Sequence, residues 1–332
     1  MAGVAVVNRQ ALRRVLRLRS LIAGPLAMEK HLRHDPVMLE EIDQLFALRP
    51  NSVVVDGTLG LGGHSERFLS HLTSRGTLVA CDWDLGMLER ARERLLGTSP
   101  ARIELHHCDF RDLPTLLQQL GLMADGYLLD LGLNSAQVDD ADRGMSFRDH
   151  GPLDMRMDRT RGEPASSLLN RMALGELESA LWEYGDERWA RMIARRIVER
   201  RKREPLRTTE DLVECVLAAI PPGARDKRIH PATRTFQAIR ILVNRELTEL
   251  DSALIESASC LAPGGVLAIL SYHSGEDRIV KNTFRILAES GEFEEVYRKP
   301  VTATEEEVRR NPRSRSAKLR ALRRVAPTGQ SS

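Results

Sequence analysis

The sequence predicts an α/β fold in which a mostly parallel sheet is interrupted by a helical insertion. Three observations support this fold class. Short apolar runs alternate with amphipathic stretches from residue 52 to residue 132, the alternation stops between about 139 and 233, and an apolar run returns at 266–273. Strands that alternate with helices form a parallel, doubly wound sheet.

The first part of the predicted sheet consists of short strands rich in apolar or β-branched residues. The stretches between them have helical spacing, as with Phe68, Leu69 and Leu72. The predicted strands are 52–56, 76–82, 102–110 and 125–132, and the predicted helices are 64–72 and 85–96.

After residue 139 the apolar residues have helical rather than strand spacing. Thr209 is the expected N-cap of one helix, which ends at Pro221-Pro222-Gly223. One long amphipathic helix is expected over 233–261, before a fifth strand at 266–273. The predicted domains are a basic extension at 1–28, an α/β domain in two pieces at 29–138 and 234–325, the helical insertion at 139–233 and a tail at 326–332.

The composition excludes several protein classes. With 332 residues, 42% hydrophobic and 29% charged, the chain can bury a large core and is not intrinsically disordered. No uncharged apolar run approaches the roughly 18 residues of a membrane helix. The four cysteines form no C-x-x-C pair, which argues against a zinc ribbon and a disulfide scaffold. We therefore expect a cytoplasmic protein without a membrane partner.

Basic residues are unevenly distributed, although the net charge is only +2. Residues 1–28 carry five arginines and no acid, 188–207 is rich in arginine, and the chain after Glu307 is basic throughout. Each cluster alone is explained by a solvated surface, but three together favour an anionic partner such as a nucleic acid. Residues 1–28 fit either a mitochondrial presequence or an upstream start codon, and we exclude them from the fold.

A glycine-rich loop follows the first predicted strand, with the sequence DGTLGLGGH from Asp56 to His64. In doubly wound folds, ligands bind at the carboxyl ends of the strands, and glycines let the backbone approach them. Asp82 ends the second strand, where a carboxylate accepts hydrogen bonds from ribose hydroxyls. This pattern alone fits NAD and S-adenosylmethionine (SAM) about equally.

Three details favour SAM. Ser65 replaces the third glycine of the dinucleotide motif that begins at Gly60. The carboxylate of Asp56 precedes the loop, where a pyrophosphate gains nothing from an anion but cationic SAM tolerates one. Asp130 closes the fourth strand, where amino-methyltransferases place their acceptor-side motif.

Eight long motifs follow one another along the chain beyond the basic extension. They are HDPVMLEE (34–41), DGTLGLGGHS (56–65), DGYLLDLG (125–132), RGMSFRDHGPLDMRMD (143–158), YGDERWARMIARRIVERR (184–201), HPATRTFQAIRILVNREL (230–247), SYHSGEDRIVK (271–281) and NPRSRSAKLR (311–320). With these motifs the chain resembles one family, the bacterial 16S ribosomal RNA cytosine-N4-methyltransferases of the RsmH/MraW type. The resemblance implies a class I SAM-dependent methyltransferase with a Rossmann-like, mostly parallel sheet and an inserted all-helical substrate-recognition domain. It also implies SAM as methyl donor and a decoding-centre cytidine of small-subunit rRNA as target.

The resemblance also implies a set of site residues. Asp82 is expected at the ribose and Phe110 beside the adenine. The complete set of implied SAM contacts is Gly62, Gly63, His64, Asp82, Phe110, Asp130 and Gln137. The chain departs from the family pattern at Asn134, Ala136 and Gly275, which concerns the geometry of the target pocket.

Methylation of the N4 amine requires alignment and hydrogen-bond acceptors, because its lone pair is delocalised into the ring. Asp130 and Asn134 lie just past the fourth strand and are the predicted catalytic residues, with the alternative that Asp130 serves only the SAM side. The sulfonium is a good leaving group, so we expect no metal. His273 is expected to hold the target base or close the pocket. A structural role is expected for Asp154 and Asp158.

Phosphate contacts are expected from arginines and stacking from the few aromatic residues. The arginines proposed to grip flanking phosphates are Arg191, Arg195, Arg234, Arg240 and those after Glu307. The aromatic candidates are Phe147, Trp182, Tyr184, Trp189 and Tyr272.

Three other functions remain open from the sequence. A DNA amino-methyltransferase would share the chemistry, but no Pro-Pro-aromatic motif follows Asp130. A non-catalytic RNA-binding assembly factor would retain the fold, and an NAD-dependent dehydrogenase would differ in its cofactor. The expected partner is small-subunit rRNA or the small ribosomal subunit, with a homodimer as an open alternative to a monomer.

Overall fold

The computed structural model describes residues 35–148, 150–226 and 228–326. The predicted basic extension at 1–28 and tail residues 327–332 lie outside this part. By its contacts the chain divides into Met1–Pro36 and Val37–Ser332, and every described helix and strand belongs to the second unit. None of the described helices is both long and apolar enough to cross a membrane.

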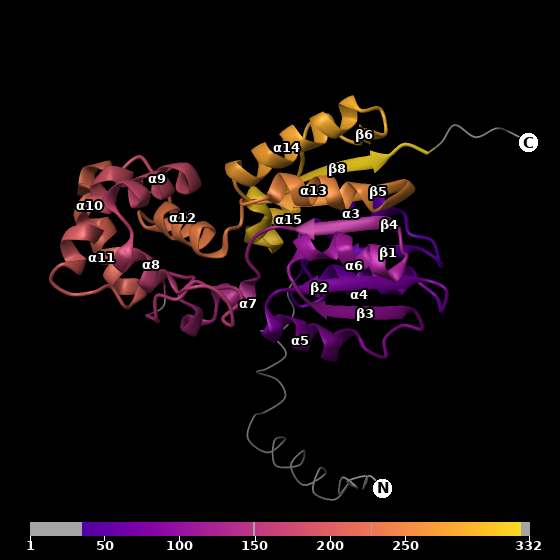
Figure 1. The fold of residues 1–332 in the computed structure, drawn as a ribbon, viewed down its shortest axis with the longest axis horizontal. Helices are drawn as coiled ribbons and strands as arrows, with labels where there is room; N and C mark the ends of the chain where they lie inside the picture. The colour runs from indigo at the N-terminus through magenta and orange to yellow at the C-terminus, as the bar shows by residue number, and fades with distance from the viewer. Residues whose placement is uncertain (1–34, 149, 227, 327–332) are drawn as a thin grey trace, which may run out of the picture. The chain divides into compact units, whose positions relative to one another are not determined.

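One eight-stranded sheet forms the α/β domain, with the strand order β3-β2-β1-β4-β5-β8-β6 and β7 paired to β8 (Figure 1). Strands β1 to β5 are parallel, whereas β8 is antiparallel to its neighbours β5, β6 and β7. The parallel half confirms the predicted fold class. The strands are β1 (Val53–Asp56), β2 (Thr77–Asp82), β3 (Arg102–His107), β4 (Ala124–Asp130), β5 (Leu261–Ser271), β6 (Phe293–Glu295), β7 (Val301–Thr302) and β8 (Lys318–Arg324).

Helices cover both faces of this sheet, because side chains alternate along each strand and both sets are apolar. Val55, Tyr127 and Leu129 are packed in one core with helices α6, α13 and α14. Val54 and Leu128 are packed in the other core with α3, α4 and α5. These helices are α3 (Leu39–Phe46), α4 (Gly63–His71), α5 (Leu85–Leu95), α6 (Leu113–Leu120), α13 (Leu250–Ser259) and α14 (Ser274–Glu289).

The helical insertion has a hydrophobic core of its own, which includes Leu181, Ile193 and Phe236. Its helices are α8 (Ala165–Arg171), α9 (Leu174–Gly185), α10 (Ala190–Arg201), α11 (Thr209–Ala219) and α12 (Thr233–Asn244). Thr208, not Thr209, caps α11: its extended backbone lets the side chain accept a hydrogen bond from Asp211 N. Two short helices, α7 (Ser135–Val138) and α15 (Glu305–Arg310), complete the named α-helices.

The prediction of one helix over 233–261 is wrong. The chain leaves the helix at Arg245, whose φ is 51°, and resumes it after Glu249, whose φ is 58°. Helix α12 packs in the core of the insertion and α13 against the sheet. The apolar periodicity continues across the break, so it could not reveal that the two halves serve different cores. Helix α12 therefore extends the insertion past the predicted boundary at residue 233.

The end of the basic C-terminal segment is an internal strand. Strand β8 lies between β5 and β6. Lys318 and Arg320 pair with Asp277 of α14 at 2.9 and 2.7 Å, and Arg320 is buried. Arg323 pairs with Glu294 on the sheet edge. These three cations are therefore engaged within the fold, whereas Arg309 and Arg315 earlier in the segment are exposed.

The Asp277 cluster gives a stability test. Asp277→Ala leaves the Arg320 guanidinium buried without its carboxylate, and we expect it to lower the free energy of unfolding by about 3 kcal/mol. Glu294→Ala is the matched control: its partner Arg323 is 39% exposed, so the expected loss is at most about 1 kcal/mol. Urea denaturation at pH 7 measures both, and equal losses would contradict the assignment.

Candidate functional site

The loop between β1 and α4 is held in a conformation that requires glycine. Gly60 and Gly62 have φ values of 53° and 77°, in the left-handed region. A Cβ on Gly60 would lie only 2.5 Å from the side-chain nitrogen of Asn134, so the close approach of Asn134 also requires glycine at this position. Gly62 is the N-cap of α4. Gly60, Leu61 and Gly63 of this loop are partly exposed at the carboxyl end of β1, whereas Gly62 is buried.

Asp82, the last residue of β2, holds this loop in place through a hydrogen bond. Its Oδ2 accepts a hydrogen bond from Gly60 N at 2.7 Å, and its Oδ1 accepts one from Asp84 N at 2.8 Å. A carboxylate offers about four lone-pair positions, so each oxygen retains one for a ligand hydroxyl. The predicted ribose-binding role is thus compatible with the bonds that Asp82 already makes.

Asp84 is a site residue that the sequence analysis missed. Its side chain caps α5 by accepting hydrogen bonds from Gly86 N and Met87 N. It also accepts a hydrogen bond from Gln137 at 2.9 Å and forms an ion pair with Arg143 at 2.6 Å. Gln137, predicted to contact SAM, therefore holds Asp84 in this structure. The sequence did contain a signal for Asp84, because an aspartate directly before the predicted helix at 85–96 is a typical N-cap.

Asp130 ends β4 and is fixed by two hydroxyl groups. Its backbone N donates to Thr58 Oγ1 at 2.6 Å, and Tyr272 OH donates to its Oδ1 at 2.7 Å. Oδ2 accepts no hydrogen bond within the described part of the chain. Asn134, the second predicted catalytic residue, uses its Oδ1 to accept from Ala136 N at 2.9 Å, and its side-chain nitrogen faces Gly60.

Two other predicted SAM contacts have partners of their own. His64 is buried, and its Nε2 lies 3.0 Å from the carbonyl oxygen of Val37. Phe110 begins the 3-10 helix after β3 and is also buried, with the guanidinium of Arg111 4.8 Å from its ring centroid. Gly63 is the first residue of α4. Their roles in cofactor binding stay predictions.

The three carboxylates at the strand ends are difficult to ionise. Burial raises the pKa of Asp82 to about 7, and the nearby charges of Asp84 and Asp56 add to this effect. Burial likewise raises the pKa of Asp130 to about 7 and that of Asp56 to about 6, although hydrogen bonds from Tyr272 and Ser65 oppose the increases. When these carboxylates are ionised, the site attracts a cation and repels a pyrophosphate. The structure therefore favours SAM over NAD more clearly than the sequence does.

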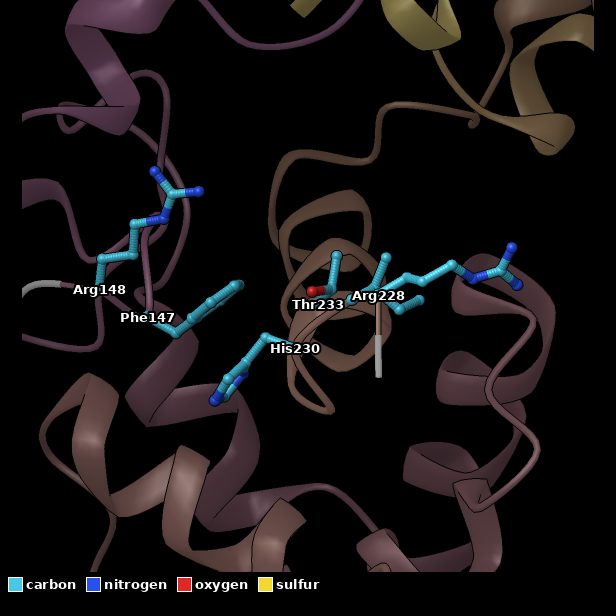
Figure 2. Close-up of a pocket in the computed structure, with 6 residues that line it drawn as sticks. Phe147, Arg148, Arg228, His230 and Thr233 are labelled. Carbon is cyan, nitrogen blue, oxygen red and sulfur yellow. The ribbon is translucent and has the colours of Figure 1, made fainter. Parts of the chain in front are cut away.

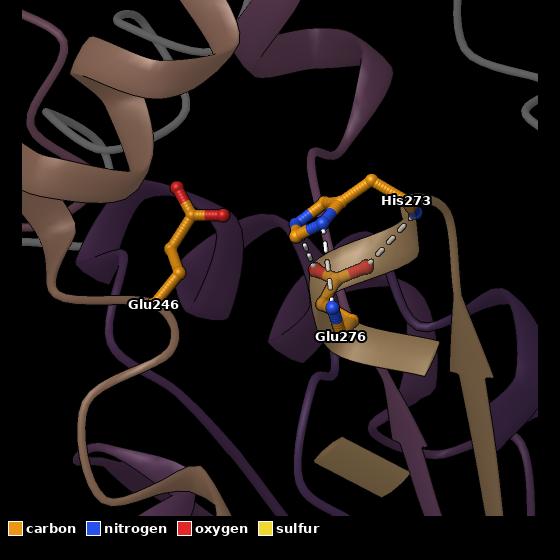
Figure 3. Close-up of side chains that lie close together, drawn as sticks. All are labelled: Glu246, His273 and Glu276. Carbon is orange, nitrogen blue, oxygen red and sulfur yellow. Dashed lines mark hydrogen bonds and ion pairs between the residues drawn. The ribbon is translucent and has the colours of Figure 1, made fainter. Parts of the chain in front are cut away.

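A second polar cluster contains His273 and Glu276, which follow Tyr272 in the chain, and the sequence analysis missed it in part (Figure 3). Glu276 Oε2 accepts hydrogen bonds from the backbone N of Tyr272 at 2.9 Å and of His273 at 3.3 Å. Nε2 of the His273 ring lies 3.2 Å from Oε1 of Glu276. Burial would raise the pKa of Glu276, but its bond with His273 lowers it overall. The cluster therefore fixes the backbone that carries Tyr272.

Glu246 completes this cluster, since one ligand atom from each of Glu246, His273 and Glu276 lies within 4.8 Å of the others. That spacing alone would suit a metal ion. However, Arg240 binds Glu246 through two hydrogen bonds of 2.8 and 2.7 Å and offsets its charge. Arg240, predicted to contact phosphate, is thus engaged within the fold.

The remaining predicted phosphate ligands differ in their surroundings. Arg234 donates to the carbonyl oxygen of Asp186 at 3.0 Å. Arg191 and Arg195 are exposed on α10. Asp154, expected to be structural, pairs with Arg156 at 2.7 Å.

Comparison with known proteins assigns the family. A model described as the MraW methylase family matches residues 31–325. The chain belongs to this family. It is 43% identical to "Ribosomal RNA small subunit methyltransferase H" of Heliobacterium mobile, over 90% of this chain and 100% of that protein. Proteins of the same description are 44% identical in Pelobacter propionicus (88% and 99% covered) and 45% identical in Koribacter versatilis (88% and 94% covered).

Membership in the MraW methylase family confirms the resemblance and the predicted enzyme class, a SAM-dependent methyltransferase. An rRNA methylase of known structure from Streptococcus thermophilus is 14% identical, with a TM-score of 0.37 and coverage of 92% of this chain and 98% of that chain. A score this low establishes nothing further, so the assignment depends on the sequence matches.

The raised pKa of Asp130 predicts how stability depends on pH. Because the folded-state pKa (about 7) exceeds the ordinary value of 3.8, the folded protein retains a proton that the unfolded chain releases between these pH values. The protonated carboxyl of Asp130 therefore makes its full contribution to stability below about pH 4, and this contribution is lost as the pH rises through 7. Asp130→Asn stays neutral, so its Tm should exceed that of the wild type by a few degrees at pH 8 and match it at pH 4.

Calorimetry at the two pH values measures this difference. Asp139→Asn is the control, because Asp139 is an exposed carboxylate with a surface partner, Arg313. If the wild type were as stable as Asp130→Asn at pH 8, that result would contradict the raised pKa of Asp130.

Proposed function

We propose that the protein methylates the exocyclic N4 of a decoding-centre cytidine in small-subunit rRNA. The observation that carries this proposal is the pair of acids at the carboxyl ends of β2 and β4, the strands on either side of β1: buried Asp82 beside the glycine loop and half-buried Asp130 with a free carboxylate oxygen. The name shared by the relatives, ribosomal RNA small subunit methyltransferase H, supports the substrate. We propose the small subunit or its rRNA as partner and the cytoplasm as location.

The residues of the loop fit SAM by their charge and hydrogen-bonding groups. Gly63 is partly exposed at the start of α4, and Asp82 retains lone pairs for ribose hydroxyls. When bound, SAM supplies a methyl group on a positively charged sulfur, which is a good leaving group. The carboxylates of Asp56, Asp82 and Asp130 match that charge when they are ionised, whereas a pyrophosphate would be repelled.

Asp130 is the proposed acceptor of the target amine. Tyr272 occupies Oδ1, so Oδ2 is the oxygen that can accept a hydrogen bond from N4. Such a bond localises the nitrogen lone pair as the new bond forms. Thr58 holds the backbone of Asp130 and Glu276 holds that of Tyr272, so the carboxylate is oriented before the substrate arrives.

The same carboxylate can take the proton that the amine loses. A pKa of about 7 places Asp130 near neutral pH, where a group is effective both as a base and in releasing the proton afterwards. Asn134 stays a proposed second acceptor. Its Oδ1 already caps α7 through Ala136 N, so only its second lone pair is available.

A methyl-transfer assay with labelled SAM on small subunits that lack the modification tests this proposal. We expect N4-methylcytidine in the rRNA by nucleoside mass spectrometry. Asp130→Asn should lower kcat by at least about 100-fold because it removes the base. Asp82→Ala should instead weaken SAM binding by roughly 10-fold or more, since it loses charged hydrogen bonds. Asp139→Asn should retain wild-type values.

The outcomes separate the alternative functions. Label in DNA but not in subunits would indicate a DNA amino-methyltransferase. SAM binding without transfer to any acceptor, or no SAM binding, would contradict the enzyme proposal and favour an assembly factor. Light scattering on the full chain decides between a monomer and the homodimer left open by the sequence.

Tyr272→Phe gives a prediction that a merely structural role of Tyr272 would not produce. The hydroxyl lowers the pKa of Asp130, so its loss should raise that pKa further. We expect kcat/KM for subunits to fall as pH decreases below 7 in the wild type, and the same decline to begin at a higher pH in the variant. An unchanged midpoint would contradict a role for ionised Asp130.

A further inference from the structure

An open pocket lies in the helical insertion, apart from the strand-end site (Figure 2). It has a volume of about 590 Å³ and is formed by the loop that follows residue 146 and the segment that leads into α12. Its lining residues are Phe147, Arg148, Arg228, Ile229, His230 and Thr233. No described contact of the strand-end site uses these side chains.

Two aromatic rings form one side of this pocket. Phe147 and His230 are stacked, with centroids 4.5 Å apart and planes within 15°. Phe236 packs edge-on behind Phe147 at 5.5 Å, and His230 Nδ1 accepts a hydrogen bond from Ala232 N at 3.2 Å. The rings are thus held in place before any ligand arrives. Burial and the charge of Arg225 lower the pKa of His230.

Two arginines provide positive charge beside the rings. Arg148 is exposed and forms no ion pair within residues 35–148, 150–226 and 228–326. The Arg228 side chain is 91% exposed and only loosely paired with Asp226 at 3.7 Å. Figure 2 shows the two side chains on opposite sides of the pocket. This contrasts with the arginines of β8, which have buried or close partners.

The pocket is connected to the cofactor loop through a short stretch of chain. Arg143 binds Asp84 at 2.6 Å and also donates to the carbonyl oxygen of Met157 at 3.0 Å. Phe147 follows Arg143 by four residues, which span at most about 14 Å. The aromatic platform is therefore within reach of the nucleotides that flank a base at the strand-end site.

We propose that this pocket binds one unpaired nucleotide of the rRNA substrate that flanks the target cytidine. The base would stack on Phe147 and His230, and its phosphates would lie between Arg148 and Arg228. The inference deepens the proposed function and rests on it. A target base must leave its stack to be methylated, which also frees its neighbours for aromatic stacking.

Charge reversal of the two arginines tests the phosphate contacts. Arg148→Glu and Arg228→Glu should each raise KM for small subunits about tenfold while kcat and the Kd for SAM stay unchanged. Each should also reduce the slope of log KM against log salt by about 0.7, the value for one lost single-strand phosphate contact. Arg285→Glu on α14 is the matched control, since Arg285 is 64% exposed and, among the described residues, pairs with Glu289 alone.

Two substitutions at His230 test the stack. His230→Ala should raise KM for subunits, and His230→Phe should restore most of the affinity because it keeps a ring over Phe147. Thermal unfolding verifies that each variant is folded, since His230 Nδ1 also contacts the start of α12.

The failure of this inference is distinguishable from that of the proposed function. Wild-type transfer to subunits, with Arg148→Glu and Arg228→Glu both equal to Arg285→Glu in KM and salt slope, would overturn the pocket and leave the function intact. Wild-type protein that neither binds nor methylates subunits would overturn both.

Discussion

The carboxylate of Asp82 is the interaction on which the site depends. It binds Gly60 N on one side and Asp84 N on the other, so it joins the loop after β1 to the start of α5. Asp84 in turn holds Arg143, the residue from which the chain leads into the helical insertion. One buried side chain thereby holds the glycine loop and, through a single neighbour, the beginning of the helical insertion.

Placing three carboxylates at these strand ends lowers the stability of the fold, and a bound cation would explain why they are present. Asp56, Asp82 and Asp130 have raised pKa values chiefly because burial removes water from their carboxylates, and nearby charges add to this for Asp82 and Asp130. A fold optimised for stability would replace at least one with a neutral residue. Their retention is explained if a positively charged ligand completes the site, because its charge offsets the cost of ionising desolvated carboxylates.

The sequence predicted the parallel half of the fold well for a simple reason. Strands such as β2 are buried on both faces and are visible as uninterrupted apolar runs, and their carboxyl ends carry the acids of the site. The same reasoning failed at β8, where Lys318 and Arg320 suggested a surface. Their partner Asp277 lies about forty residues earlier on α14, and no local pattern records that pairing.

Long-range partners also explain what was missed within the site. Asp82 and Asp130 could be found from their positions at strand ends, but the bonds of Tyr272 to Asp130 and of Arg143 to Asp84 join distant segments. Likewise, the break at Arg245 depends on which core each half-helix enters. Local periodicity specifies the faces of a helix and not the partner against which a face packs.

The cores of the sheet and of the insertion are separate, so polar contacts connect the two parts. Arg143 forms an ion pair with Asp84 at 2.6 Å, and Ser274 in the first turn of α14 donates to Asp186 at 2.9 Å. An interface of this type permits relative motion far more readily than an apolar one. Ser274 directly follows His273, whose backbone Glu276 holds together with that of Tyr272. The insertion therefore contacts the α/β domain close to Tyr272, the residue that orients Asp130. RNA bound to the insertion would act on this contact.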